Sequence, residues 1–137
     1  METITIFTEE FAHIMLGLAE DGPLPLNEKN FCIQIEDPSE KSVIMEVNTE
    51  VQKFIQHRGD PPYAETGLRL IKIQHPLHLM NKLSADLIAQ NIQLTFVSTF
   101  DWNYVLIPNE NLHLFEEIAK KNYQIEHKSI VDFWEED

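Results

Sequence analysis

The chain has 137 residues, of which 43% are hydrophobic, and carries a formal net charge of -13 at pH 7. A chain of this size can bury about 70% of its unfolded surface, so a globular fold is expected and intrinsic disorder is not. The acidic surface repels phosphate backbones and anionic lipid headgroups, which argues against nucleic acids and membrane surfaces as partners.

The cysteine content and the amino terminus favour a cytoplasmic protein. Cys32 is the single cysteine, so no disulfide can form within the chain and a reducing compartment is favoured over secretion. The sequence shows no basic segment followed by a long apolar run, and no stretch approaches the roughly 18 apolar residues of a membrane span. Neither a signal peptide nor a membrane span is therefore expected.

The first half of the chain predicts strands followed by one helix. Apolar runs at residues 3–6 and 11–18 predict strands. Residues 31–47 predict a hairpin, because turn-forming residues separate the runs FCIQIE and SVIMEV. A short helix is expected over residues 49–57, capped by Asn48 or Thr49.

The second half begins after RGDPPY at residues 58–63, whose prolines predict an extended linker. Strands are predicted by LRLIKI, IQLTFV, NYVLI and YQIEH, and helices by the apolar spacing of residues 80–88 and 112–119. Asn91 suits the left-handed position that ends the first of these helices. The order over residues 68–126 is strand, helix, strand, strand, helix, strand. It predicts a ferredoxin-like sandwich, an antiparallel sheet covered on one face by two helices.

Four segments also carry a family resemblance: FAHIMLGLAEDGPLP, FCIQIEDPSEKSVIMEV, GLRLIKIQHPL and STFDWNYVLIP, in that order. Together they resemble the tandem ACT-domain proteins, bacterial relatives of the arginine sensors that control the TOR kinase pathway in animals and of aspartate kinase regulatory domains. The resemblance implies an α+β fold of two ACT-like βαββαβ modules. A degenerate N-terminal module would occupy residues 1–62 and a C-terminal module residues 63–126, followed by an acidic aromatic tail at residues 127–137.

The resemblance further implies an effector, usually an amino acid, bound in a cleft between the modules without a cofactor. Carried over by position, the candidate ligand-binding residues are Gln74, His75, Leu77 and His78 in a strand-to-helix turn, and Thr99, Asp101 and Asn103 in a hairpin. The chain departs from the family in two respects. The strand-to-helix turn is short and contains no glycine, and Asn103 stands where relatives often have aspartate.

Several candidate residues have more than one interpretation. Asp101 is a candidate partner for the ammonium group of an effector, or it closes the hairpin turn. His75 and His78 lack the further ligands that a zinc site needs, so no metal site is predicted. Trp102 is a candidate partner contact or equally folds back over the core of its own module. Phe133 and Trp134 pose the same choice, with docking on their own domain favoured over contact with a partner.

The sequence contains no nucleophile paired with a base, no phosphate-binding loop and no dinucleotide fingerprint, so catalysis is not expected. These observations lead to a non-enzymatic regulatory module that binds an amino acid or similar metabolite and signals to a protein partner. The alternative is a protein-interaction module that keeps the fold and has lost the effector. ACT-like sheets often pair with one another, so a homodimer is compatible with either hypothesis.

Overall fold

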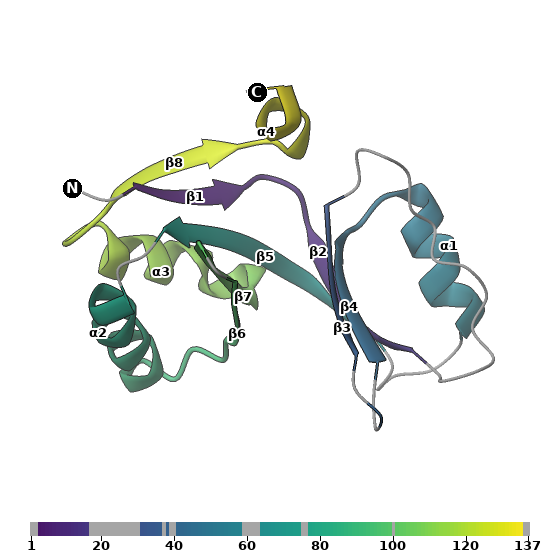
Figure 1. The fold of residues 1–137 in the computed structure, drawn as a ribbon, viewed down its shortest axis with the longest axis horizontal. Coiled ribbons are helices and arrows are strands. Elements are labelled where there is room, and N and C mark those ends of the chain that lie inside the picture. Colours follow the sequence, from purple (N-terminus) through teal and green to yellow (C-terminus); the bar gives the residue numbers. More distant parts are fainter. Residues whose placement is uncertain are drawn as a thin grey trace. The chain divides into compact units, whose positions relative to one another are not determined.

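The computed structural model describes residues 3–16, 31–36, 38, 41–58, 64–74, 77–99 and 101–135. The chain divides into two compact units, and each unit combines segments that are distant in sequence. Unit 1 consists of residues 1–8 and 69–129, and unit 2 consists of residues 9–68 and 130–137 (Figure 1).

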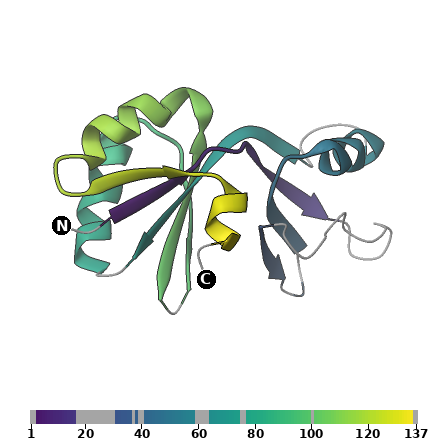
Figure 2. The ribbon, with the colours of Figure 1, turned by 90° about the horizontal axis from the view of Figure 1, so that it is seen from above.

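Unit 1 is a sheet with helices packed on one face. Its elements are β1 (Thr3–Phe7), the later part of β5 (Ala64–Gln74), α2 (Leu77–Ala89), β6 (Thr95–Ser98), β7 (Trp102–Pro108), a 3-10 turn (Asn109–Asn111), α3 (Leu112–Ala119) and β8 (Gln124–Lys128). The strands follow the order β8, β1, β5, β7, β6 across the sheet. Figure 2 shows the same strands and helices from above.

The first strand of the chain lies inside this sheet. β1 pairs antiparallel with β5, with Ile6 opposite Ile71, and parallel with β8, with Thr5 opposite Glu126. The sequence predicted a purely antiparallel sheet built from residues 63–126, and the parallel pair corrects that prediction. The reason is that β1, from the far end of the chain, separates the two strands that a split βαβ unit would place side by side.

The core of unit 1 lies between the sheet and helices α2 and α3. Alternation along a strand directs every second side chain to the same face. The apolar side chains of this face pack with those of the two helices. The buried cluster consists of Ile4, Ile6, Ile71, Ile73, Leu83, Leu87, Ile92, Val105, Ile107, Phe115, Ala119 and Tyr123. The prediction that two helices cover one face is confirmed for this unit.

Unit 2 is a smaller antiparallel sheet. Its elements are β2 (Phe11–Leu16), β3 (Cys32–Glu36), β4 (Lys41–Glu46), α1 (Thr49–Arg58), the first part of β5 and α4 (Ile130–Glu135). The strand order is β3, β4, β2, β5, and β3 pairs antiparallel with β4, which confirms the predicted hairpin. Val51 of α1 joins Ala12, Ile14, Leu16, Val43 and Met45 in the buried core.

Most of the predicted tail forms a docked helix in unit 2. Ile130 of α4 is only 2% exposed. Its N–H donates to both carboxylate oxygens of Glu9, at 3.1 and 3.0 Å. The ring of Phe133 lies 6.2 Å from that of Phe31, centroid to centroid. α4 is therefore held by a carboxylate at its amino end and by an aromatic contact further along.

The unit boundaries differ from the predicted domain boundaries. The sequence divided the chain after residues 62 and 126, whereas the chain passes between the units after residues 8, 68 and 129. The crossing after residue 68 falls within β5, so a single strand serves both units. Residues 59–63 of the predicted linker lie outside the described residues.

Two local predictions are confirmed by backbone and side-chain geometry. The N–H of Val51 donates to Asn48 Oδ1 at 2.9 Å, so Asn48 is the residue that caps α1. Asn91 has a φ of 59°, in the left-handed region that often ends a helix.

We expect Asn48→Ala to lower the free energy of unfolding by about 1 kcal/mol, because it removes the acceptor for an otherwise unpaired amide of the first helical turn. Denaturant titration followed by circular dichroism would measure this loss. Asn48→Asp is the matched control, since its carboxylate can accept the same hydrogen bond. Equal stability of the two variants would contradict the capping role.

Candidate functional site

The turn between β6 and β7 is closed by Thr99 and Trp102. The N–H of Thr99 donates to the carbonyl oxygen of Trp102 at 2.8 Å. The N–H of Trp102 donates to Thr99 Oγ1 at 3.2 Å, and the same hydroxyl donates back to the Trp102 carbonyl oxygen. The Thr99 hydroxyl, a predicted ligand contact, is thus engaged in the turn.

Asp101 lies at the exposed tip of this turn. Among the described residues it takes part in no hydrogen bond or ion pair, and the turn hydrogen bonds are made by Thr99 and Trp102. The Asp101 carboxylate therefore makes none of the hydrogen bonds that close the turn. The predicted contact of Asp101 with an effector stays a prediction.

Asn103 is the most unusual polar residue of the hairpin. It is 0% exposed, and strand alternation places it on the same sheet face as Val105 and Ile107, which α2 and α3 cover. Ser98 Oγ donates to Asn103 Oδ1 at 2.6 Å. Asn103 Nδ2 has no hydrogen-bond partner among the residues that the structure describes. A buried donor left unpaired costs about 1–3 kcal/mol.

The predicted strand-to-helix turn is described only in part. Gln74 ends β5, and Leu77 and His78 begin α2. The side chains of these three residues, and His75 as a whole, lie outside what the structure describes. The structure therefore leaves this half of the predicted site as a prediction.

Trp102 lies on the opposite face of the sheet from Asn103. Lys72 Nζ lies 4.0 Å from the centroid of the Trp102 ring and 5.9 Å from that of Tyr104. Lys72 is only 9% exposed. Burial lowers the pKa of Lys72, and the positive charge of Lys128 lowers it further. Trp102, predicted as a partner contact, packs against a lysine of its own sheet.

The sequence analysis missed Lys72. A signal was present, because Leu68, Leu70 and Lys72 occupy alternate positions of one strand. Lys72 therefore shares a face with two apolar side chains, which is the pattern expected of a buried lysine. For the other predicted partner contacts, Phe133 packs on Phe31, and the side chain of Trp134 lies outside the described residues.

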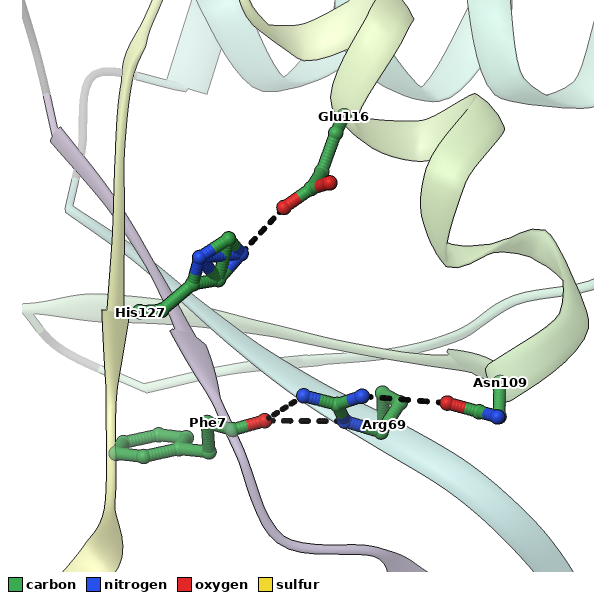
Figure 3. A network of polar contacts seen from close by, with 5 residues as sticks. All are labelled: Phe7, Arg69, Asn109, Glu116 and His127. Atoms are coloured by element: carbon green, nitrogen blue, oxygen red, sulfur yellow. Dashed lines mark hydrogen bonds and ion pairs between the residues drawn. The ribbon is translucent and has the colours of Figure 1, made fainter.

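Figure 3 shows two groups of polar contacts in unit 1, one around Arg69 and one between Glu116 and His127. Arg69 donates from Nε and Nη2 to the carbonyl oxygen of Phe7, at 3.1 and 2.7 Å, and from Nη1 to Asn109 Oδ1 at 3.2 Å. On α3, Glu116 contacts the imidazole of His127 from β8. These contacts hold β1 and β8 to the rest of the unit. We therefore assign Arg69, Glu116 and His127 a structural role.

Two further observations bear on chemistry. Burial raises the pKa of the Cys32 thiol, which keeps it protonated and a weak nucleophile. Across the described residues, no group of three or more His, Cys, Asp or Glu side chains is arranged to hold a metal ion. In the same part of the chain, no helix is long and apolar enough to cross a membrane.

The chain matches no family model and no curated protein, but it resembles several solved structures. Protein Atu0741 from Agrobacterium tumefaciens is 16% identical with a TM-score of 0.70, and the match covers 93% of each chain. VC0802 from Vibrio cholerae, of unknown function and described as a possible transport protein, is 11% identical with a TM-score of 0.61 over 88% of each chain.

The ligand-free regulatory subunit of aspartate kinase from Thermus thermophilus is 12% identical with a TM-score of 0.54, over 86% of this chain and 95% of that one. At such identities the likeness establishes the fold alone. The chain thus has a mixed α+β fold similar to that of an aspartate kinase regulatory subunit, which agrees with the sequence resemblance at that level.

The lowered pKa of Lys72 predicts a pH-dependent stability. Over the pH range between this lowered value and the ordinary lysine value of about 10.4, the unfolded chain binds more protons than the folded chain. The free energy of unfolding contributed by this group therefore rises with pH in that range. We expect Lys72→Met to abolish the rise, measured by urea titrations from neutral to alkaline pH.

The control for this experiment is Lys53→Met, which removes a lysine whose side chain is 68% exposed. Its pH profile should follow the wild-type profile. An unchanged profile in Lys72→Met would show that the buried lysine does not govern alkaline stability.

Proposed function

We propose that this protein is a non-enzymatic regulatory module of two ACT-like units, which binds an amino acid or a similar small metabolite and signals its presence to a protein partner. The fold resemblance to an aspartate kinase regulatory subunit supports the regulatory class. The β6–β7 hairpin forms one wall of the proposed site, as the family resemblance implies.

The observation that carries this proposal is the unpaired donor of Asn103. A polar atom that is fully buried without a partner is rare in folded proteins, and each instance calls for an explanation. Ser98 already occupies Oδ1, so Nδ2 is the atom left to recognise a ligand. A carboxylate or carbonyl oxygen of the effector would accept from it and remove the cost of its burial.

Asp101 supplies the complementary charge for the proposed ligand. Asn103 is neutral, so it cannot pair with an ammonium group as the aspartate of related proteins would. The carboxylate of Asp101, two residues earlier and exposed to solvent, can take that role. An amino acid carries both groups, an acceptor oxygen for Asn103 and an ammonium for Asp101, and this combination favours it over a purely anionic or cationic ligand.

Burial of Asn103 also suggests how binding would be transmitted. The side chain is buried on the face that α2 and α3 cover, so a ligand can reach Nδ2 only after the packing around it rearranges. The ligand would then bind the rearranged form in preference to the closed one. Such differential affinity is the requirement for a ligand to shift a conformational equilibrium.

The first test is thermal unfolding of the whole chain against each of the twenty amino acids. A ligand present at 100 times its dissociation constant stabilises the folded state by about 2.7 kcal/mol, which shifts the midpoint by several degrees. We expect one amino acid to do so, and Asp101→Ala to reduce the shift. Absence of any shift at millimolar concentration would favour the interaction module that has lost its effector.

A second test uses the free energy of unfolding without ligand. We expect Asn103→Leu to leave this free energy unchanged or to raise it by about 1 kcal/mol, because it replaces an unpaired buried donor by an apolar group of similar size. The same variant should lose the ligand-induced shift. Such a gain in stability with loss of binding is typical of functional sites.

Asn122→Leu, at an exposed position, serves as the control for the added apolar group and should bind as the wild type does. If Asn103→Leu is strongly destabilised, the amide is making an essential structural contact instead. That outcome would rule out a ligand-binding role for Asn103 Nδ2.

A further inference from the structure

β1 is an interior strand of unit 1 although the chain leaves that unit directly after it. Ile4 and Ile6 are fully buried in the core between the sheet and its helices. The strand forms an antiparallel ladder with β5 and a parallel ladder with β8. After Thr8 the chain belongs to unit 2 and returns to unit 1 only at Arg69.

Unit 1 is incomplete without this strand. Among the described strands, β8 lies at the end of the sheet and is joined to it through β1. Removal of β1 would leave the backbone of β8 unpaired and would expose an edge of β5 beside Ile71 and Ile73. Exposed strand edges flanked by apolar side chains are templates for pairing with another chain.

The contacts that hold β1 do not depend on its covalent connection. Two of them lie where the strand ends: Arg69 binds the carbonyl oxygen of Phe7, and the N–H of Thr8 donates to the Lys128 carbonyl oxygen at 3.0 Å. A β1 strand from another molecule could make both of these contacts and could form the same two ladders with β5 and β8. The connection to β2 consists of Thr8, Glu9 and Glu10, and short connections favour exchange of an element between copies.

We propose that β1 is an exchangeable strand: residues 3–8 of one molecule can fill the position between β5 and β8 of a second copy, which gives a reciprocal strand-swapped dimer. Each unit 1 in this dimer has the same sheet as in the monomer. The partner is thus a second copy of this chain, and the interface is the strand position that β1 now occupies. Exchange of an identical element is a low-cost route to a dimer.

Exchange depends on a competition for the position between β5 and β8. The β1 strand of the same chain competes there with the β1 strand of a second chain. A tethered strand has an effective concentration on the order of millimolar, so the strand of the same chain predominates in dilute solution. The charge of -13 on each chain further opposes association. Exchange is therefore expected when the protein refolds at high concentration and in the presence of salt, which screens this repulsion.

The test uses single cysteines on facing positions of β1 and β8 in full chains that also carry Cys32→Ser. Thr5 lies opposite Glu126 in the parallel ladder. Chains with Thr5→Cys are mixed with chains carrying Glu126→Cys, unfolded in urea, refolded at high concentration in salt and oxidised. We expect a disulfide-linked heterodimer on a non-reducing gel, and less of it when refolding takes place in dilute solution.

The matched control pairs Thr3→Cys with Lys128→Cys. Thr3 lies opposite Gln124, four residues from Lys128, so these cysteines are out of register and should not be linked. Circular dichroism and thermal unfolding establish that each variant folds as the Cys32→Ser parent does. Linkage of the in-register pair alone supports strand exchange. Strand exchange would be overturned by any of three results: no linkage, equal linkage of both pairs, or dimers in which the in-register pair is not linked.

Discussion

The structure of unit 1 depends on the insertion of β1 between β5 and β8. This single strand supplies two buried isoleucines, Ile4 and Ile6, and backbone partners for both neighbours. Arg69 fixes its end by donating twice to the Phe7 carbonyl oxygen, a charge-assisted contact stronger than one between neutral groups. Because β1 belongs to unit 1 and β2 to unit 2, the amino-terminal segment is required for both units.

The hairpin that follows β6 combines a well-satisfied turn with one unsatisfied residue. Thr99 and Trp102 bond to each other through backbone and hydroxyl groups, so these polar groups are satisfied within the turn. One residue later, Asn103 buries an unpaired donor among apolar side chains. An apolar side chain of similar size would cost less there, and the burial of this amide is the observation behind the binding function proposed for the hairpin.

The two faces of the same sheet have different chemistry. On the face covered by α2 and α3, the described buried residues are mostly apolar and Asn103 buries an amide among them. On the other face, Lys72 lies against the rings of Trp102 and Tyr104, which offset part of the cost of burying its charge. The alternation of a strand places Trp102 and Asn103, neighbours in sequence, on opposite sides.

The local elements could be predicted from the sequence alone. Alternating apolar residues, turn chemistry and capping residues predicted the hairpin of β3 and β4, the helices α1, α2 and α3, the cap at Asn48 and the left-handed Asn91, because these depend on neighbours a few positions away. The split βαβ order and the hairpin that carries Thr99, Asp101 and Asn103 were also predicted in this way.

The pairing of distant segments became visible only in the folded structure. The insertion of β1, the docking of α4 on Phe31 and Glu9, and the crossing between units inside β5 all join residues far apart in sequence, for which local patterns carry no information. The same holds for burial within the candidate site. Asp101 and Asn103 are equivalent turn residues in the sequence, and packing against the helices is what separates an exposed carboxylate from a buried, unpaired amide.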